Sequence, residues 1–463
     1  MLRVFRQYYP IRNAIFVFGE GLLILLSVMV ACWVILEKES FRVEVQLILK
    51  ALLITLTCQV CLYYNDLYDL KITDKLNELG VRLIQALGAA AIVLAIVYII
   101  FPDVVITQGI FIVSMVFVIM LIVSWRIGYT FILNRGMFNE KIILIGESAI
   151  AQEIFQQINE KKDSGYQIVS IISNQGWNLC NESSSARFIC IDSYENICDI
   201  ALSSGVKKVI VALKEKRGAL PIKELLLCRV NGIEILDGNS FYEMLSGKLI
   251  VDQIDPSWLI FSNGFRKSWL KKFVKRTFDL TVSLCMIIIL FPLLVLVAII
   301  IKIDSKGPVF FSQERVGRNH KIYMVHKFRS MRTDAERETG PVWAQLNDQR
   351  ITRVGNFIRK WRIDEIPQLW NILKGEMSFV GPRPEREYFV KQLLEIIPYY
   401  SERFTVKPGL TGWAQVSYGY GASVEDAIEK LNYDLFYIKN LSILMDMMIV
   451  AKTVKTVLIG KGR

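Results

Sequence analysis

The stretch "RKWRIDEIPQLWNILKGEMSFVGPRPE", residues 359–385, contains two adjacent acids, Asp364 and Glu365, among arginine, lysine and tryptophan residues. Cations at this density suit a phosphate-rich substrate, because they neutralise its negative charge. The acids equally suit the start of a helix: Asp is a favoured N-cap, Glu is favourable in the first turn, and Pro367 is tolerated there. The residue types alone therefore leave both helix capping and a chemical role open.

Further cations lie in short clusters of the same C-terminal part. In "KFRSM", residues 327–331, Lys327 and Arg329 stand two residues apart and share one face if the stretch is a strand. In "FVGPRPE", Arg383 lies between two prolines, which restrict the local backbone and so the direction of its guanidinium. "VKPGLTGWAQV", residues 406–416, is a Pro-Gly turn followed by a tryptophan. Each cluster alone is weak evidence for a site.

The middle of the chain, residues 141–255, alternates apolar strand-like segments such as "KIILIG" and "YQIVSII" with helix-like segments such as "SAIAQEIFQQINE". Such alternation predicts a parallel, doubly wound sheet. The first turn, "GESAIA", has one glycine where a dinucleotide fingerprint has three, and no acid ends the second strand. We therefore predict a degenerate Rossmann-like domain used for packing, dimerisation or regulation rather than for nucleotide binding.

Apolar residues make up 53% of the 463-residue chain, and they are concentrated in long windows. Four such windows precede the sheet-like part: 13–36, 43–64, 81–101 and 109–127. Each approaches the ~20 residues that cross a ~30 Å hydrocarbon core. The sequence thus predicts a four-helix transmembrane bundle, and we expect no cleavage after the first window because further spans follow it.

Lys and Arg residues near these windows predict the orientation of the bundle. They precede the first window, separate the second from the third and follow the fourth, whereas the loop around Pro102 and Asp103 has none. The residues are Arg3, Arg6 and Arg12, then Lys71, Lys75 and Arg82, then Arg126, Arg135 and Lys141. Both ends of the bundle, and everything after it, are therefore expected on the cytoplasmic side.

A fifth apolar run, Leu280–Ile301, follows a basic and aromatic segment, residues 256–275, that suits an anionic lipid surface better than a nucleic acid. Lys and Arg residues flank the run on both sides, which is poorly compatible with crossing the membrane. Pro292 lies near its middle and should break the helix. We therefore predict a re-entrant helix–break–helix that returns to the cytoplasmic face.

Cysteine and histidine usage excludes several classes of site. Cys58 and Cys61 form a C-x-x-C inside an apolar window without a second pair nearby, and we interpret them as small apolar residues. The only histidines are His320 and His326, which disfavours a His-rich metal site or a Ser-His-Asp triad. No D-x-D occurs, which argues against a metal-dependent glycosyltransferase of the common nucleotide-sugar fold.

Taken in order, "GPVFFSQERVG", "KFRSM", "DEIPQLWNILKGEMSFVGPRPE" and "KPGLTGWAQV" resemble the bacterial sugar transferase family, the polyisoprenyl-phosphate hexose-1-phosphate transferases. The resemblance covers residues 275–463 densely, and four spans followed by a Rossmann-like domain are similar to the long members of that family. One departure is Phe291, where members often have a serine before the helix-breaking proline. That difference leaves the angle of the expected break open.

The resemblance implies transfer of hexose-1-phosphate from a UDP-sugar to undecaprenyl phosphate, with release of UMP. It implies that Asp364 attacks the sugar-bearing phosphate to give an aspartyl-phosphate sugar, and that Glu365 helps to bind Mg²⁺. Side chains expected to neutralise the phosphates are Lys327, Arg329, Arg353 and Arg383. Asp434, in "NYDLFYIKN", resembles a further family position and is a candidate for substrate binding or for structure.

The sequence therefore predicts an α-helical membrane protein with α/β domains. Its expected parts are a four-span bundle (1–135), a degenerate Rossmann-like cytoplasmic domain (136–255), a basic-aromatic linker (256–275) and a membrane-associated α/β catalytic domain with a re-entrant helix (276–463). Expected partners are a UDP-glucose or UDP-galactose donor, undecaprenyl phosphate, the bacterial inner membrane, Mg²⁺ and a second copy in a homodimer, with no nucleic acid. The alternative is a membrane-bound sensor whose Rossmann-like domain binds a ligand.

Overall fold

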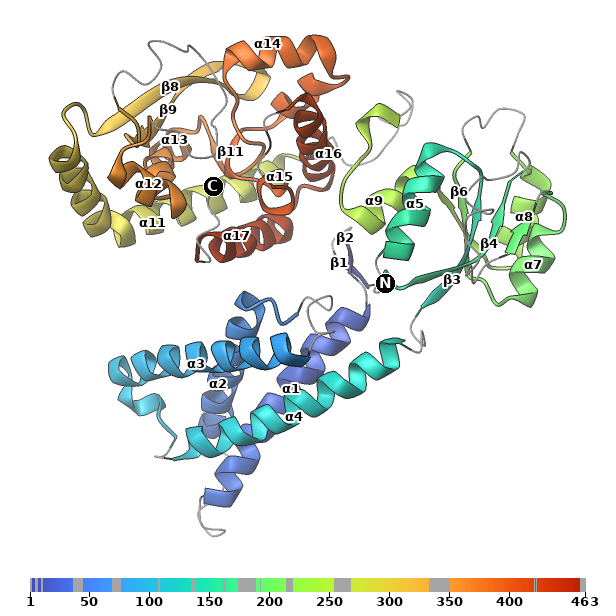
Figure 1. The fold of residues 1–463 in the computed structure, drawn as a ribbon, viewed down its shortest axis with the longest axis horizontal. Helices are drawn as coiled ribbons and strands as arrows, with labels where there is room; N and C mark the ends of the chain where they lie inside the picture. Colours follow the sequence, from blue (N-terminus) through green and yellow to red (C-terminus); the bar gives the residue numbers. More distant parts are fainter. Residues whose placement is uncertain are drawn as a thin grey trace. The chain divides into compact units, whose positions relative to one another are not determined.

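The computed structural model describes residues 2–4, 7–9, 11–35, 45–68, 76–106, 109–134, 139–160, 164–173, 189–191, 193–213, 220–253, 268–332, 350–419, 421 and 423–458. The chain divides into two compact units, Met1–Leu236 and Asp237–Arg463. Figure 1 shows the helices and strands of both. Much of the predicted linker, residues 256–267, lies outside the described residues, as do Arg6, Lys71, Lys75 and Arg135.

The first unit begins with a short hairpin, β1 (Leu2–Val4) and β2 (Gln7–Tyr9), followed by α1 (Ile11–Ile35), α2 (Val45–Tyr64), α3 (Leu76–Ile100), the 3₁₀ turn η1 (Pro102–Val104) and α4 (Ile110–Asn134). Helix α1 packs against α4 and α2, and α2 packs against α3. Among the described residues, five helices are long and apolar enough to cross a membrane, namely α1 to α4 and the later α11. The four predicted apolar windows are thus confirmed as helices.

A charged pair lies in the core of these four helices. Arg126 of α4 donates from Nε and Nη2 to Glu20 Oε1 of α1, at 2.8 and 2.6 Å. Its Nη1 donates to the carbonyl of Leu67, in the turn after α2, at 2.6 Å. Both charged side chains are at most 1% exposed. Since a charge buried without a partner is very costly, the pair fixes how α1 and α4 align.

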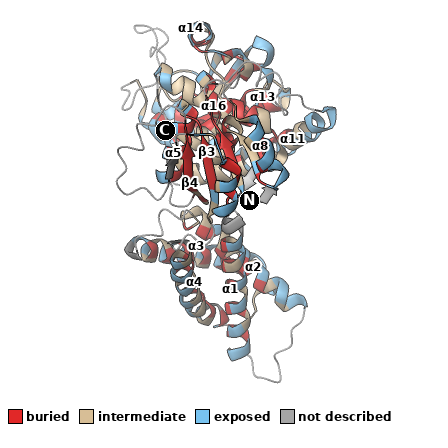
Figure 2. Ribbon diagram, turned by 90° about the vertical axis from the view of Figure 1, so that its right-hand side faces the viewer, coloured by how far each residue is buried: buried red, intermediate tan, exposed pale blue. Residues whose placement is uncertain are grey.

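The second part of this unit is the predicted doubly wound sheet. Its strands are β3 (Glu140–Ile145), β4 (Tyr166–Ile172), β5 (Ile189–Ile191), β6 (Lys208–Val211) and β7 (Glu234–Asp237), in the spatial order β5-β4-β3-β6-β7. The β3 pairings with β4 and β6 are parallel, as is that of β4 with β5. Helices α5 (Ala149–Glu160), α7 (Ile197–Ser203) and α8 (Ile222–Val230) connect the strands. Buried strands between helices are visible in Figure 2.

Gly146 makes the turn from β3 into α5 with φ = +108°. A Cβ at this position would overlap the carbonyl of Ala212, which follows β6. The next residue, Glu147, accepts a hydrogen bond from Ser173 Oγ at 2.9 Å. A carboxylate thus stands at the turn where a dinucleotide fold accommodates a pyrophosphate, which agrees with the predicted degenerate character of the domain.

The second unit starts with α9 (Gly238–Ser246) and η2 (Val251–Gln253) and continues with a long helix, α11 (Trp269–Asp304). The sequence predicted a helix broken at Pro292; α11 continues as helix through this proline, and its ribbon changes direction along its length in Figure 1, so the predicted re-entrant course stays a prediction. The helix also begins inside the segment predicted to be a linker. Ser268 caps its N-terminus by accepting from Lys271 N at 3.4 Å.

Two small sheets follow α11. Strands β8 (Phe310–Val316) and β9 (Ile322–Phe328) form an antiparallel ribbon across the turn η3 (Arg318–His320), and β10 (Ser378–Val380) pairs in parallel with β11 (Gly409–Thr411). Between β9 and β10 lie α12 (Arg353–Lys360), the 3₁₀ helix η4 (Ile363–Gln368) and α13 (Leu369–Lys374). This order places the acidic pair between two short helices.

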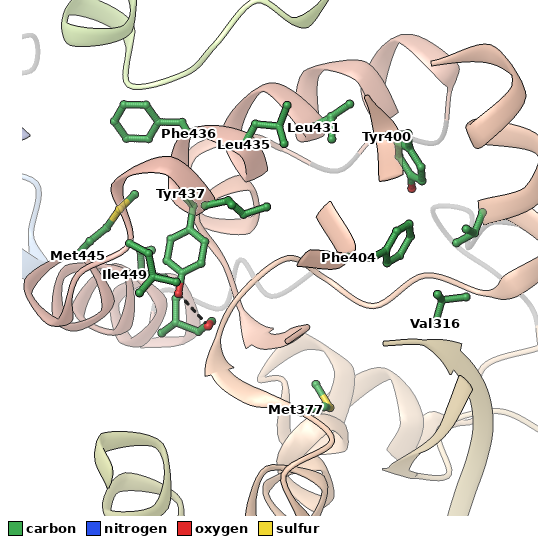
Figure 3. Close-up of a cluster of buried hydrophobic side chains, with 14 of the residues drawn as sticks. Val316, Met377, Tyr400, Phe404, Leu431, Leu435, Phe436, Tyr437, Met445 and Ile449 are labelled. Atoms are coloured by element: carbon green, nitrogen blue, oxygen red, sulfur yellow. Dashed lines mark hydrogen bonds between the residues drawn. The ribbon is translucent and has the colours of Figure 1, made fainter. Parts of the chain in front are cut away.

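The remaining elements of the second unit surround its core. They are α14 (Glu387–Ile396), η5 (Tyr400–Thr405), α15 (Trp413–Ser417), α16 (Val424–Asn440) and α17 (Ile443–Leu458). Figure 3 shows the core side chains that α16 and α17 contribute together with those of η5 and β8. Leu435 and Ile449 are fully buried there, so the surfaces that face the candidate site rest on closely packed helices.

Candidate active site

The acidic pair lies on η4, which α12 and β9 position. Helix α12 begins at the cap Thr352, whose Oγ1 accepts from Gly355 N at 2.9 Å. A side chain on Gly355 would overlap the carbonyl of Ser330, so this glycine lets α12 approach the end of β9 closely. Arg362 then turns the chain with φ = +52° and η4 follows.

The capping interpretation of the acidic pair is wrong. Asp364 and Glu365 lie inside the first turn of η4, and neither the N-terminus of η4 nor that of α13 has a side-chain cap hydrogen bond. The segment is a 3₁₀ helix leading into a six-residue α-helix. Both acids are buried, with exposures of 7% for Asp364 and 6% for Glu365. Burying two adjacent carboxylates is unfavourable unless charge nearby offsets the cost.

Glu365 is surrounded by cations from three segments. Its Oε1 accepts from Lys327 Nζ of β9 at 2.9 Å and from Arg383 Nη2 at 2.8 Å. Arg362 Nη1 lies 3.6 Å from its Oε2. Burial opposes ionisation, but the charges of Arg383, Lys327 and Arg362 hold the pKa of Glu365 well below its usual range. Glu365 is therefore a carboxylate at neutral pH.

Asp364 has a different environment from its neighbour. Within the described part of the chain, its carboxylate forms no hydrogen bond or ion pair, although it is buried. Burial, followed by repulsion from Glu365, raises its pKa to about 6, against the opposing effect of Lys327, Arg359 and Arg383. A carboxylate that is mostly ionised at neutral pH and not hydrogen-bonded is suited to attack an electrophile.

The loop that carries Arg383 is fixed by close backbone contacts. Gly381 N donates to Thr411 O at 2.9 Å, and Gly409 N donates to Pro382 O at 2.8 Å. Side chains on Gly381 or Gly409 would overlap the opposite backbone. The "GPRP" and "KPGLTG" motifs of the sequence are thus two halves of one tightly packed turn, and the second motif acts structurally.

Two arginines, Arg403, which is buried, and Arg315, which is 19% exposed, bind the carbonyl groups of this loop. Arg403 Nη2 donates to the carbonyl of Arg383 at 3.1 Å, and Arg315 Nη1 donates to that of Pro384 at 3.0 Å. Asp434 accepts from Arg403 Nη2 at 3.0 Å and is 2% exposed. Of the two roles that the sequence left open for Asp434, the structure shows contacts of the structural one: its carboxylate is covered and binds Arg403, which holds the loop.

Two further predicted substrate contacts are not part of the acidic cluster. Arg329 is buried and donates to Ser305 O at 2.7 Å and Lys306 O at 2.9 Å, so its guanidinium caps the C-terminus of α11. Arg353 is exposed as the first residue of α12 and contacts neither acid. Of the predicted cations, the structure brings Lys327 and Arg383 to the site and leaves Arg329 and Arg353 outside it.

Sequence reasoning missed four arginines that shape the site. Arg359 and Arg362 lie in the stretch that first drew attention to the acids, and their spacing of five and three residues from Asp364 and Glu365 was an available signal. Arg315 and Arg403 come from segments far from the acidic pair in sequence. Arg315 lies in the quoted motif "GPVFFSQERVG", which was a signal, whereas nothing local distinguishes Arg403 from a surface arginine.

The carboxylates also define what metal the site could bind. The described residues contain no group of three or more His, Cys, Asp or Glu placed to hold a metal ion. Asp364 and Glu365 supply hard oxygen ligands, and Mg²⁺ is commonly bound by one or two carboxylates together with substrate phosphates. The donor set fits a cation shared with a phosphate-bearing ligand, with Glu365 as the predicted protein ligand.

Comparison with known proteins places this arrangement in a family. The profile of the bacterial sugar transferase family matches residues 270–460, which include the acidic pair and all the cations described above. A second profile, described as a CoA-binding domain, matches residues 63–234. Together the two matches cover strands β3 to β6 of the parallel sheet and most of the second unit.

Several curated proteins are similar over long stretches. An Escherichia coli UDP-glucose:undecaprenyl-phosphate glucose-1-phosphate transferase is 30% identical over 71% of this chain and 70% of its own length. An Erwinia amylovora UDP-galactose-lipid carrier transferase is 30% identical over 72% and 71%. An Aeromonas hydrophila UDP-N-acetylgalactosamine-undecaprenyl-phosphate N-acetylgalactosaminephosphotransferase is 41% identical over 51% of this chain, which spans about half (55%) of that relative. The chain belongs to the bacterial sugar transferase family.

Proposed function

We propose that this protein transfers hexose-1-phosphate from a UDP-sugar to undecaprenyl phosphate and releases UMP, the first membrane step in building a polysaccharide. The observation that carries the proposal is the contrast within the acidic pair. Glu365 accepts hydrogen bonds from two cationic side chains, Lys327 and Arg383. Asp364 is buried and mostly ionised at neutral pH, and it has no hydrogen-bond or ion-pair partner among the described residues. That is the environment expected of a nucleophile beside a phosphate-binding group.

In the proposed reaction, a carboxylate oxygen of Asp364 attacks the sugar-bearing phosphorus of the donor. The bond between this phosphorus and the oxygen bridging to the uridine-bearing phosphate breaks, and UMP leaves with the electron pair. An oxygen of the lipid phosphate then attacks the same phosphorus and displaces the Asp364 carboxylate. The product is a lipid-linked diphosphate sugar, and Asp364 returns to its starting form.

Lys327 and Arg383 supply the positive charge that this reaction needs. Both contact Glu365 Oε1, so they lie within one side-chain length of the adjacent Asp364. Arg383 is about one third (35%) exposed, so its side chain reaches the surface of the site. Preorganised cations of this kind commonly contribute ~3–4 kcal/mol each to transition-state stabilisation. A Mg²⁺ ion bound by Glu365 would add charge neutralisation of the donor phosphates.

We further propose that the second unit lies on the cytoplasmic face of the bacterial inner membrane, with α11 inserted from that face. The start of α11 contacts the domain through Arg276, which donates to the carbonyls of Ile372 and Leu373. Its end contacts the same domain through Arg329 and Ser305. A helix crossing a ~30 Å core would carry its two ends to opposite sides, away from a common domain.

The surface of α11 between these contacts supports insertion. Large apolar side chains are exposed along it, and 11% of its most apolar window is buried. They are Leu284, Ile288, Ile289, Phe291, Leu296, Ile299 and Ile303. An exposed apolar surface of this length is typical of contact with lipid. A site supplied by a membrane lipid would then lie at the interface where the lipid phosphate is found.

The proposal is tested first without the lipid acceptor. Purified full-length protein is incubated with Mg²⁺ and a panel of UDP-sugars that includes glucose, galactose and their N-acetylated forms, and the intact mass of the chain is measured. We expect a hexose-phosphate adduct and released UMP with one donor or a few, and no adduct on the Asp364→Asn variant. Glu387→Ala, which removes an exposed ion pair with Lys391, is the matched control and should form the adduct normally.

Two results would contradict parts of the proposal. If UMP appears only after undecaprenyl phosphate is added and no adduct forms at any time, the transfer is direct and Asp364 is not the nucleophile. If neither UMP nor adduct forms with any donor, with or without lipid, the proposed activity is wrong. The sensor hypothesis would then be tested through ligand binding to the sheet domain.

A further inference from the structure

The segment Asp237–Gln253, here called the strap, lies between the two regions matched by family profiles and belongs to neither. It follows the parallel sheet without a spacer, because β7 ends at Asp237 and α9 begins at Gly238. Asp237 caps α9 by accepting from Ser240 N at 3.4 Å. Structurally, however, the strap is part of the second unit.

Charged side chains attach the strap to α16. Glu243 accepts from Lys439 Nζ at 2.6 Å and from Asn440 Nδ2 at 2.9 Å, near the end of α16. Lys248 donates to Glu429 Oε1 at 2.6 Å, nearly three turns earlier on the same helix. The Glu243 and Lys439 side chains are 11% and 12% exposed, so this pair is largely shielded from solvent. The strap is therefore bound by charged hydrogen bonds at two points along the length of α16.

Backbone contacts and apolar packing lie between these two points. Asn432 accepts from Leu249 N through its carbonyl at 3.2 Å and from Val251 N through Oδ1 at 2.9 Å. Trp413 Nε1 donates to the carbonyl of Gly247 at 2.8 Å. Leu249 and Val251 belong to the core of the second unit. The strap is thus built into this core, although it precedes α11 and the matched catalytic region.

Helix α16 leads directly to the candidate site. Asp434 lies two residues after Asn432 and binds Arg403 at 3.0 Å. Arg403 also contacts Tyr400 Oη and donates to the carbonyl of Arg383 at 3.1 Å. Arg383 in turn contacts Glu365 at 2.8 Å. These contacts join the strap to the phosphate-neutralising arginine through buried residues alone until Arg383 itself.

We infer that the strap is a positioning element for the reaction. Its contacts hold α16 in place, which fixes the positions of the Asp434 and Arg403 side chains and, through Arg403, the position of Arg383. The inference rests on the proposed function for its kinetic consequence, but not for its structural one. The strap also links the sheet domain to the site covalently. Asp237 is both the last residue of β7 and the first residue of the strap, so a movement of β7 would move the start of the strap. Arg403, Asp434 and Glu243 are positioning residues in this scheme and touch no reacting atom.

The test uses the full-length protein in lipid nanodiscs and the Glu243→Ala variant. Hydrogen exchange followed by mass spectrometry should show faster exchange at residues 381–386, as well as in the strap itself. With the UDP-sugar that the adduct experiment identifies as donor, kcat/KM for UMP release should fall about tenfold. A displacement of the Arg383 guanidinium by a fraction of an ångström is enough for this effect. The control is Glu387→Ala, which removes an exposed ion pair with Lys391 in the same unit. It should change neither the exchange rates nor kcat/KM.

A double-mutant cycle separates positioning from general loosening. If the strap acts through Arg403, then Glu243→Ala combined with Arg403→Lys should lower kcat/KM little more than Arg403→Lys alone. Independent losses that multiply would overturn the inference. Faster exchange confined to residues 237–253, with residues 381–386 unchanged, would overturn it as well. The exchange measurement decides the matter even if the wild type releases no UMP, which would count against the proposed function alone.

If Glu243→Ala fails to fold, Lys248→Met replaces it. Lys248 and Glu429 are 19% and 23% exposed, so this pair is less buried, and methionine keeps most of the side-chain stem. The same outcomes apply, with a smaller expected drop of about threefold in kcat/KM.

Discussion

Replacing Asp279 by alanine should loosen the attachment of α11 to the loop that carries Arg383. Asp279 is 2% exposed and accepts from Phe379 N at 3.0 Å and from Ser378 Oγ at 2.8 Å. Both donors belong to β10, whose last residue precedes Gly381. The substitution removes the acceptor of a buried backbone N–H and the partner of a buried hydroxyl.

The size of the effect follows from these contacts. A hydrogen bond to a charged group contributes about 1.5–3 kcal/mol, and an orphaned buried donor costs about as much. Ser378 Oγ keeps the carbonyl of Val380 as a partner at 3.0 Å, and Lys275, 3.8 Å from Asp279, keeps Asp446 at 2.8 Å. The principal loss is therefore at Phe379 N–H, and we expect the free energy of unfolding to fall by about 3 kcal/mol.

Pulse proteolysis of the full-length protein in a urea gradient, in detergent, measures this loss. With a denaturant slope of about 1–3 kcal/mol per M, the midpoint should fall by about 1 M or more. Asp279→Asn is the graded control, because its amide oxygen still accepts from Phe379 N, and it should cost about 1 kcal/mol. Equal midpoints for wild type and Asp279→Ala would refute the reasoning, since the helix would then not depend on this carboxylate.

Three further predictions concern buried charge. Glu20→Gln should lower the thermal stability of the membrane helices by about 3 kcal/mol, because it leaves the Arg126 guanidinium buried without a counter-charge; an unchanged melting curve in detergent would contradict this. Mn²⁺, used as a probe for Mg²⁺, should bind more tightly in the presence of UMP. Three cations already neutralise Glu365, so this carboxylate alone attracts a metal ion weakly and the phosphate of UMP supplies further oxygen ligands. Equal affinity with and without UMP, measured by electron paramagnetic resonance, would contradict this. Burial raises the pKa of Asp434 to about 6 from its usual 3.8, so the folded state binds this proton more tightly than the unfolded chain. Relative to Asp434→Asn, the wild type should therefore gain up to about 3 kcal/mol in its free energy of unfolding as the pH falls from 6 to below 3.8. Urea midpoints of the two proteins that change with pH in the same way would contradict this.

Local pattern was sufficient for much of the fold. The four apolar windows and most of the alternating strands and helices between residues 141 and 237 were predicted in order, because hydropathy and periodicity report on segments that fold against lipid or a sheet. Strand β5 was missed, and residues 237–253, predicted as part of the sheet domain, belong to the second unit. The helix around Pro292 was predicted at the right place, and its backbone remains helical through the proline. Proline restricts the backbone locally, but the course of the helix beyond it depends on packing and stays a prediction.

The candidate site shows where local reasoning ends. The acids, Lys327 and Arg383 were identified from a family resemblance, and the structure brings these four together. Arg329 stands two residues from Lys327 in the same motif, yet it caps α11 instead. Alternation along a strand gives the face of a side chain but not what that face meets.

By itself, the sequence determined the kind of protein this is: apolar helices long enough for a membrane, a parallel sheet, and a motif with an acidic pair among cations. Only the tertiary structure decided which cations meet Glu365, that Asp364 stays free of partners in the described part of the chain, and that Asp434 acts through Arg403. The physical reason is that side-chain pairing depends on segments distant along the chain, such as Lys327 and Glu365, 38 residues apart. Their meeting is set by how β9 packs against η4, and no local pattern encodes it.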